Sequence, residues 1–340
     1  MRPIYKVILI LLFIGPTNIR GQELKIADLG KCELISGNFI EDCKIGYRVF
    51  GDLNEARDNI IVIPSWFLGS SEGWYNIMKS GFMDFSGFYV VAFDALGNGI
   101  SSSPSNSVSQ RGDAFPEITI ADMVNTQYSV LTDLMGFEKI YAVVGISMGG
   151  MQTYEWAFRY PEYMEKLVPI IGSPKLSAYD IHLWQIQYDL IEMRRKCDCD
   201  KPLELLEALQ AMNYGSPKLM HESTDPDIAY EDLRDGVTDM ILPDPISYDY
   251  QRQLSAMMTH DVYKHAKGTG KSINELLKAD LFSIVVRTDH VVTPFSAIDF
   301  KGATDTELLI LENDCGHDGF RCGAPSAPAS VRNFLMKGRN

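Results

Sequence analysis

The sequence of 340 residues predicts an α/β fold, in which helices cover both faces of a mostly parallel β-sheet. Two observations indicate this class. Most segments with strand character are continuously apolar, which is typical of strands buried on both faces. They also alternate along the chain with segments of helical periodicity. Because 46% of the residues are hydrophobic, the chain can form a full core, as one large domain or two small ones.

The expected elements follow from apolar runs, periodicity and turn residues. We expect strands over 45–53, 59–64, 88–94, 139–144, 167–171, 281–286 and 307–311. Helical periodicity predicts helices over 119–135, 148–159 and 325–337. Thr119 is a suitable N-cap for the first of these helices, and Pro161 ends the second.

The pattern changes between residues 175 and 265, where helical, charged and Met-rich segments broken by prolines replace the strands. We interpret this stretch as a helical cap inserted into the sheet domain. The core of the fold is then expected to comprise residues 22–174 and 266–340.

The N-terminus has the pattern of a secretory signal peptide. Arg2 and Lys6 precede the apolar run 7–14, and Gly21 precedes a candidate cleavage point. We therefore expect residues 1–21 to be a signal peptide and the mature protein to be secreted or periplasmic. The alternatives are a buried first strand or an uncleaved anchor, although the run is short for a transmembrane helix.

The chain is acidic, with a net charge of −14, and this restricts its partners. Residues 1–21 contain three basic residues and no acidic one, so their removal would give −17. Such a chain should repel nucleic acid and anionic lipid surfaces. We therefore expect a small molecule as the ligand, with no nucleic acid partner and no stable membrane insertion.

Six cysteines in an exported chain favour disulfides over free buried thiols. Cys32 and Cys43 flank the turn 36–38, so a cross-strand pair in one hairpin is plausible. Cys315 and Cys322 bracket a loop with candidate catalytic residues, whereas the cysteines at positions 197 and 199 are too close together for partners to be inferred. The cysteines and histidines do not have the spacing of a zinc site, so we expect no metal.

The most informative motif is a Gly-x-Ser-x-Gly turn between a buried strand and a helix. The segment 141–144 is apolar, Gly145, Ser147 and Gly149 follow, and helical periodicity begins directly afterwards. This context is typical of the nucleophile elbow of α/β-hydrolases, which raises one Ser hydroxyl above the end of the sheet. A purely structural turn is the alternative.

A Ser nucleophile needs a base within hydrogen-bond reach and an acid that orients the base. On this fold the chain order is Ser, then Asp or Glu, then His. Asp289 follows the strand 281–286 and His317 follows the strand 307–311, so both are expected at carboxyl ends of strands. Alternatively, Asp289 forms a turn and His317 is a solvated loop residue. Glu312 and Asp314 are the other candidate acids.

The oxyanion of an acyl-transfer intermediate needs two positioned donors. We expect one to be the backbone N–H of Met148, just after the nucleophile at the N-terminus of a helix. The other should come from the loop after the strand 59–64. Phe67 is the preferred donor there and Trp66 the alternative, and both aromatic side chains could also line the pocket.

The elbow and its helix, Gly145–Gln152 with Glu155-Trp156-Ala157, closely resemble those of homoserine O-acetyltransferases. Further matching motifs are Gly51-Asp52-Leu53-Asn54, Phe115-Pro116-Glu117-Ile118-Thr119-Ile120 and Gly316-His317-Asp318. The likeness covers most of 45–175 and 280–335. The resemblance implies the α/β-hydrolase fold, the three catalytic roles assigned above, and Asp318 as a ligand of the substrate amino group. It also implies acetyl-CoA as co-substrate and a homodimer.

Two loops differ from the family pattern, and they bear on the reaction. The loop 97–104 has a different sequence, and Ser65 stands where the family usually has His. Together with the expected export, these differences favour an exported serine esterase that forms an acyl-enzyme and needs no cofactor. The alternative is an O-acyltransferase that moves an acyl group from acyl-CoA to a small hydroxy acceptor. A second alternative is a non-catalytic binding protein on the same scaffold.

Overall fold

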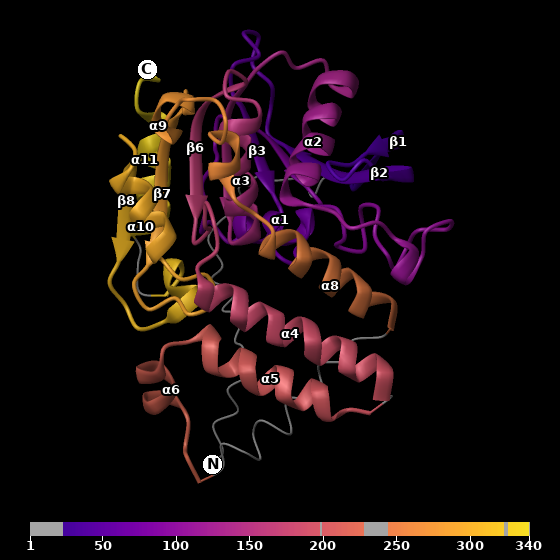
Figure 1. The fold of residues 1–340 in the computed structure, drawn as a ribbon. Helices are drawn as coiled ribbons and strands as arrows, with labels where there is room; N and C mark the ends of the chain where they lie inside the picture. Colours follow the sequence, from indigo (N-terminus) through magenta and orange to yellow (C-terminus); the bar gives the residue numbers. More distant parts are fainter. Residues whose placement is uncertain (1–22, 198, 228–243, 323–325, 340) are drawn as a thin grey trace.

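The computed structural model describes residues 23–197, 199–227, 244–322 and 326–339. The signal peptide expected over 1–21 lies outside the described residues. Within the described part of the chain, eight strands form one sheet in the order β1-β2-β4-β3-β5-β6-β7-β8 (Figure 1). The strands are β1 Lys25–Glu33, β2 Phe39–Phe50, β3 Ile60–Pro64, β4 Tyr89–Phe93, β5 Ile140–Ile146, β6 Met164–Ile170, β7 Asp280–Val286 and β8 Glu307–Leu311.

The expected α/β class is confirmed. The pairs β3–β4, β3–β5, β5–β6, β6–β7 and β7–β8 are parallel, while β1–β2 and β2–β4 are antiparallel. All seven expected strands are present, but β2 begins at Phe39 rather than at 45. The sequence analysis assigned no strand to 25–33, because β1 is a largely exposed edge strand with no apolar run.

Helices cover both faces of the sheet. The helices of the core are α1 Ser71–Lys79, α2 Ile120–Ser129, α3 Met148–Arg159, α9 Ile273–Leu276, α10 Phe295–Gly302 and α11 Ser326–Met336. The helices α2, α3 and α10 pack in one hydrophobic cluster, and α1 and α11 pack in the other, on the opposite face. The expected N-cap is correct, since Thr119 accepts a hydrogen bond from the N–H of Asp122. The α-helix ends at Ser129, however, and one turn of π-helix, Val130–Leu134, continues it.

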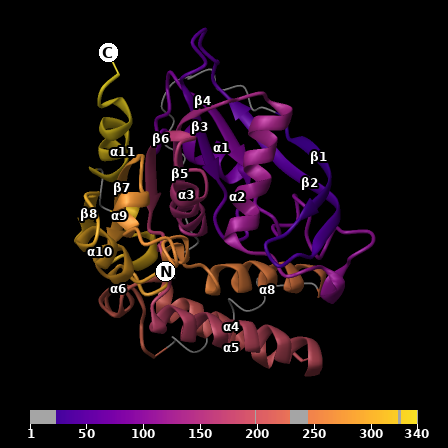
Figure 2. The same cartoon turned by 45° about the horizontal axis from the view of Figure 1, so that its top comes forward.

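Four described helices lie in the stretch that we expect to form a cap: α4 Ala178–Cys197, α5 Lys201–Tyr214, α6 Pro217–Ser223 and α8 Asp244–Met258. The arrowheads of the parallel strands point towards these helices, and α8 lies between the sheet and the pair α4 and α5 (Figures 1 and 2). Three short 3₁₀ helices are Gly112–Ala114, Val262–His265 and Gly316–Phe320. The cap helices therefore face the carboxyl ends of the strands, where ligands bind in such sheets.

Disulfides join the cysteines in three pairs. Cys32–Cys43 links β1 to β2 in the hairpin, as the sequence suggested. Cys315–Cys322 closes the loop after β8, and Cys197, the last residue of α4, pairs with Cys199. A search of the described residues found no helix that is both long enough and apolar enough to cross a membrane.

Candidate active site

The turn at Ser147 has the geometry of a strained elbow. The strand β5 ends at Ile146 and α3 begins at Met148, so Ser147 is the single residue between them. Its φ is 56°, in the left-handed region that residues with a side chain rarely adopt. Glycine is required on both sides, because a Cβ on Gly145 would collide with the carbonyl of Gly149, and a Cβ on Gly149 would lie 2.7 Å from the carbonyl oxygen of Pro64. The half-buried Ser147 is therefore fixed by its backbone.

The structure brings Ser147, His317 and Asp289 together from three separate loops. His317 Nε2 lies 3.0 Å from Ser147 Oγ, and His317 Nδ1 lies 2.8 Å from Asp289 Oδ2. Both partners of the serine are buried, with 7% exposure for His317 and 3% for Asp289. Such a chain can pass a proton from the hydroxyl to the imidazole while the carboxylate orients the ring.

The loops of Asp289 and His317 also bond to each other. Thr288 Oγ1 donates to the carbonyl of Asn313 at 2.7 Å and accepts from the N–H of Gly316 at 3.2 Å. The other carboxylate oxygen of Asp289, Oδ1, accepts the N–H of Val291 at 2.8 Å and of Val292 at 3.0 Å. These hydrogen bonds fix the positions of Asp289 and His317 relative to each other.

The cap contacts the same two loops at their edge. Asp180, on α4, accepts hydrogen bonds from the N–H and the hydroxyl of Thr293 at 2.9 and 3.0 Å. Burial raises the pKa of this carboxyl, although those hydrogen bonds oppose the shift. On α5, the ring of Tyr214 stands edge-on to that of His317, with ring centroids 6.0 Å apart. The backbone carbonyl of Tyr214 lies so close to Gly316 that a side chain at that position would collide with it.

A buried hydrogen-bond bridge connects the two segments that contain the expected oxyanion donors. Gln152 Nε2 donates to the carbonyl of Ser65 at 3.0 Å and to that of Met148 at 3.3 Å. The bridge thus ties the loop after β3 to the first turn of α3. Among the described residues, no hydrogen bond within the protein uses the N–H of Phe67 or of Met148. Their role as oxyanion donors remains a prediction.

The two tentative ligand residues have other neighbours. The indole of Trp66 lies over Gly69 and Gly73 and stands edge-on to Trp74 at 5.8 Å. Asp318 follows His317, and its carboxylate lies 3.9 Å from Arg321. A role of Trp66 or Asp318 in substrate binding remains a prediction.

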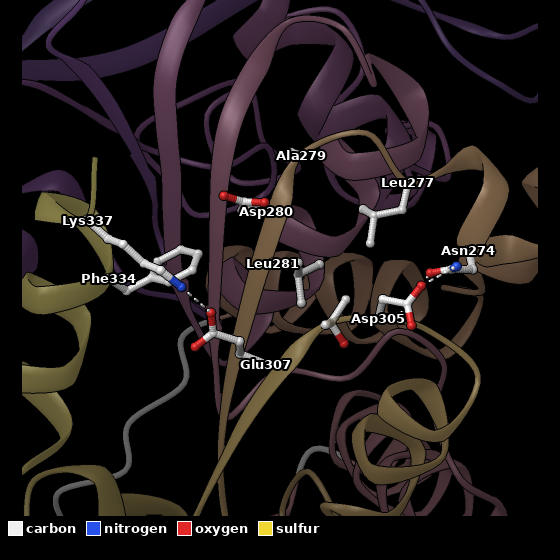
Figure 3. A pocket seen from close by; sticks show the side chains of 10 residues that line it. Asn274, Leu277, Ala279, Asp280, Leu281, Asp305, Glu307, Phe334 and Lys337 are labelled. Carbon is white, nitrogen blue, oxygen red and sulfur yellow. Dashed lines mark hydrogen bonds and ion pairs between the residues drawn. The ribbon is translucent and has the colours of Figure 1, made fainter. Parts of the chain in front are cut away.

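A cavity of about 360 Å³ lies far from these residues, at the opposite end of the sheet. Figure 3 shows Asp280 and Glu307, the first residues of β7 and β8, in its wall, whereas Ser147, Asp289 and His317 follow the carboxyl ends of their strands. Its wall contains the paired side chains Lys337–Glu307 at 3.1 Å and Asn274–Asp305 at 2.9 Å. This cavity is not part of the candidate active site.

Comparisons with known proteins agree with the fold. The family model described as the alpha/beta hydrolase fold matches residues 59–192. A solved acetylester hydrolase from Corynebacterium glutamicum superimposes with a TM-score of 0.80 and 24% identity over 93% of this chain and 95% of its own. A solved homoserine O-acetyltransferase from Bacillus anthracis superimposes with a TM-score of 0.80 and 19% identity, over 92% of this chain and 97% of its own. The chain has the α/β-hydrolase fold.

The proteins similar to this chain in sequence include both hydrolases and transferases. An ethyl acetate hydrolase of Pseudomonas veronii is 34% identical, and a probable esterase of Corynebacterium glutamicum is 36% identical. Each alignment covers 49% of both proteins, so the chain spans about half the length of these relatives. A homoserine O-acetyltransferase of Methanohalophilus mahii is 26% identical over 84% of this chain and 67% of its own. The resemblance to homoserine O-acetyltransferases is thereby confirmed.

The residues that hold the loop after β3 could not be predicted from the sequence. Gln152 stands four residues after Met148 on α3, but nothing in its surroundings indicates that its amide bridges two carbonyls. Gln253, on α8, bonds to Leu68 across a separation of 185 residues. No local pattern could signal that contact.

Proposed function

We propose that this α/β-hydrolase is a serine esterase that cleaves esters of short acyl groups through an acyl-enzyme. The proposal rests on one observation, the continuous chain from Ser147 Oγ to His317 at 3.0 Å and from His317 to Asp289 at 2.8 Å. A lone Ser hydroxyl is a poor nucleophile at neutral pH, and this arrangement is what activates it.

In the proposed acylation step, His317 Nε2 takes the proton of Ser147 as Oγ attacks the ester carbonyl carbon. The N–H groups of Met148 and Phe67 stabilise the resulting oxyanion, and Asp289 stabilises the imidazolium. The carbon–oxygen bond to the alcohol then breaks, and His317 gives its proton to the leaving oxygen. A water molecule, deprotonated by His317, then attacks the acyl carbon, and the bond from that carbon to Ser147 Oγ breaks. His317 returns the proton to Oγ, and the carboxylic acid leaves. This sequence needs no metal and no cofactor.

Two observations favour water over an alcohol as the acceptor. The relatives include proteins named ethyl acetate hydrolase and acetyl esterase, which suggests acetate esters as the substrate class. An acyltransferase of the homoserine type would need an arginine for the acceptor carboxylate, and Arg194, Arg195 and Arg252 are possible. Arg252 of the cap pairs with Glu117 at 2.6 Å and donates to the carbonyl of Phe115. A guanidinium held in this way has little capacity left for a substrate.

The second candidate is an O-acyltransferase that moves an acetyl group from acetyl-CoA to a small hydroxy acceptor. It is favoured by the position of Asp318 next to His317 and by the homoserine O-acetyltransferase that aligns over 84% of this chain. Both reactions use the same acyl-enzyme and differ only in acceptor binding and water exclusion. A non-catalytic binding protein on this scaffold is the third candidate.

We further propose that the protein is exported and works in an oxidising compartment. The three disulfides support this, because such bonds persist mainly outside the cytosol. The net charge of −14 supports a small-molecule ester or acyl donor as the partner rather than nucleic acid or an anionic membrane. A homodimer remains an expectation from the resemblance.

The experiment that tests this proposal follows acyl partitioning in the purified protein. Ethyl acetate or acetyl-CoA is supplied with and without homoserine or serine, and acetate and the acetylated amino acid are measured together. We expect acetate from the ester and none from acetyl-CoA. Acetylated acceptor at low acceptor concentration would establish the transferase instead. A wild type inert towards esters and towards a fluorophosphonate probe would favour the binding protein, and Ser147→Ala is the control for labelling.

A further inference from the structure

We propose that Gln253 of the cap helix α8 is a positioning residue for the oxyanion hole, an inference that rests on the proposed function. Its side chain is completely buried, with 0% exposure. Its Oε1 accepts the N–H of Leu68 at 2.7 Å, and its Nε2 donates to the carbonyl of Leu96 at 2.9 Å. One amide of the cap thus binds the loops that follow β3 and β4.

The bonded residue has an unfavourable backbone conformation. Leu68 has a φ of 51°, a left-handed value that glycine adopts easily and leucine does not. It is the third residue of a turn that the bond from the Gly69 N–H to the Trp66 carbonyl closes at 2.8 Å. Turns with a positive φ at this position normally have Gly or Asn there. The hydrogen bond that the Leu68 N–H donates to Gln253 helps to stabilise this conformation in the absence of a glycine.

This turn also contains the expected oxyanion donor. The carbonyl and the N–H of a trans peptide point in opposite directions. Because the Trp66 carbonyl is bonded into the turn, the N–H of Phe67 in the same peptide points out of it. If Leu68 relaxed to a negative φ, the peptide between Phe67 and Leu68 would rotate, and the turn that fixes the adjoining Trp66–Phe67 peptide, and with it the Phe67 N–H, would be less well defined. Gln253 prevents this relaxation because it holds the Leu68 N–H.

A second residue of α8 supports the same turn. Tyr250 lies three residues before Gln253, on the same face of the helix, and its ring stands edge-on to that of Phe67 with centroids 4.7 Å apart. Gln210, on α5, donates to the hydroxyl of Tyr250 at 2.8 Å. At the other end of the loop the core residue Gln152 holds the carbonyl of Ser65. One end of the oxyanion loop is therefore fixed by the core and the other by the cap.

The test compares Gln253→Met with Gln251→Met, a matched change on the same helix. Gln251 is also buried, but its amide donates to the carbonyl of Tyr188, within the cap. Removing one whole oxyanion donor typically costs about 10²–10³-fold in kcat, so misalignment should cost about 10–100-fold. We expect this loss in kcat for Gln253→Met, with KM changed less than about threefold, and near wild-type kinetics for Gln251→Met.

A trifluoromethyl ketone inhibitor gives a readout that a loosened cap would not reproduce. It forms a tetrahedral adduct with the serine and places an oxyanion in the hole. Its inhibition constant should rise in Gln253→Met by the same factor by which kcat/KM falls. An unchanged inhibition constant, or equal losses in both glutamine variants, would overturn the inference. A wild type without esterase activity would instead refute the proposed function.

The variant Gln253→Glu keeps the test decisive if Gln253→Met does not fold. A protonated Glu has the shape of Gln, accepts from Leu68 and donates to Leu96, whereas an ionised Glu places a negative charge against the Leu96 carbonyl. The activity of Gln253→Glu relative to wild type at the same pH should therefore recover as the pH is lowered. A ratio that does not depend on pH would contradict the positioning role.

Discussion

The two sides of Ser147 are stabilised in different ways. On the side of proton transfer, Asp289 and His317 lie in loops that bond to each other through Thr288, and the cap contacts only their edge. On the oxyanion side, the turn at Phe67 is held by one core residue and by Gln253 of the cap. The first side is held mainly by bonds between two loops of the core, whereas the second depends directly on a hydrogen bond to a cap residue.

The largest expected effect lies on the side of proton transfer. Asp289→Asn should lower kcat by about 10⁴-fold, because an amide cannot hold the imidazole in the tautomer that accepts the serine proton. The matched control is Asp314→Asn, at one of the two other candidate acids, which pairs with Lys218 on the surface at 2.6 Å. Steady-state kinetics should give near wild-type kcat for this control. A loss confined to Asp314→Asn would reverse the assignment of the acid.

The residues Ser147, Asp289 and His317 could be predicted from the sequence because each follows a recognisable strand. The boundary of β5 and α3 at Ser147, and the placement of Asp289 and His317 after β7 and β8, followed from apolar runs, glycines and chain order. The strand β1 was missed because an exposed edge strand has no continuous apolar run. Gln253 was missed for a different reason. Hydrophobic periodicity indicates only which face of a helix or strand is buried. It does not show that a buried side-chain amide accepts a hydrogen bond from a backbone N–H far away in the sequence.

A smaller effect concerns the attachment of the cap to the core. Asp249 lies on α8 with 2% exposure, and it accepts the N–H of Ser105 at 2.8 Å and its hydroxyl at 2.5 Å. Burial raises the pKa of Asp249 from 3.8 to about 6, although the hydrogen bonds oppose the shift. Between these two values the folded chain keeps a proton that the unfolded chain has lost. Stability therefore falls as the pH rises through this window.

The variant Asp249→Asn removes this dependence on pH, because an amide stays uncharged and can still bond to Ser105. Its free energy of unfolding should match that of the wild type near pH 4 and exceed it above pH 7 by at most about 3 kcal/mol. Urea unfolding between pH 4 and 8 measures the difference. Asp113→Asn, at an exposed carboxyl beside the same helix, is the control. Parallel curves for wild type and Asp249→Asn would refute the prediction.

The smallest expected effect on kcat comes from removing a disulfide, and it should differ between two disulfides that close short loops at different distances from Ser147. Cys32–Cys43 joins strands at the edge of the sheet, whereas Cys315–Cys322 closes the loop that carries His317. Replacing either pair by serines should cost about 2–3 kcal/mol of stability, since loop closure entropies for separations of 11 and 7 residues are similar. Only the change at Cys315–Cys322 should also lower kcat, by about tenfold, because it loosens His317 relative to Ser147.

Thermal unfolding and steady-state kinetics of both double variants test this prediction. Equal losses of kcat would mean that the bonds between the Asp289 and His317 loops fix the base without the disulfide.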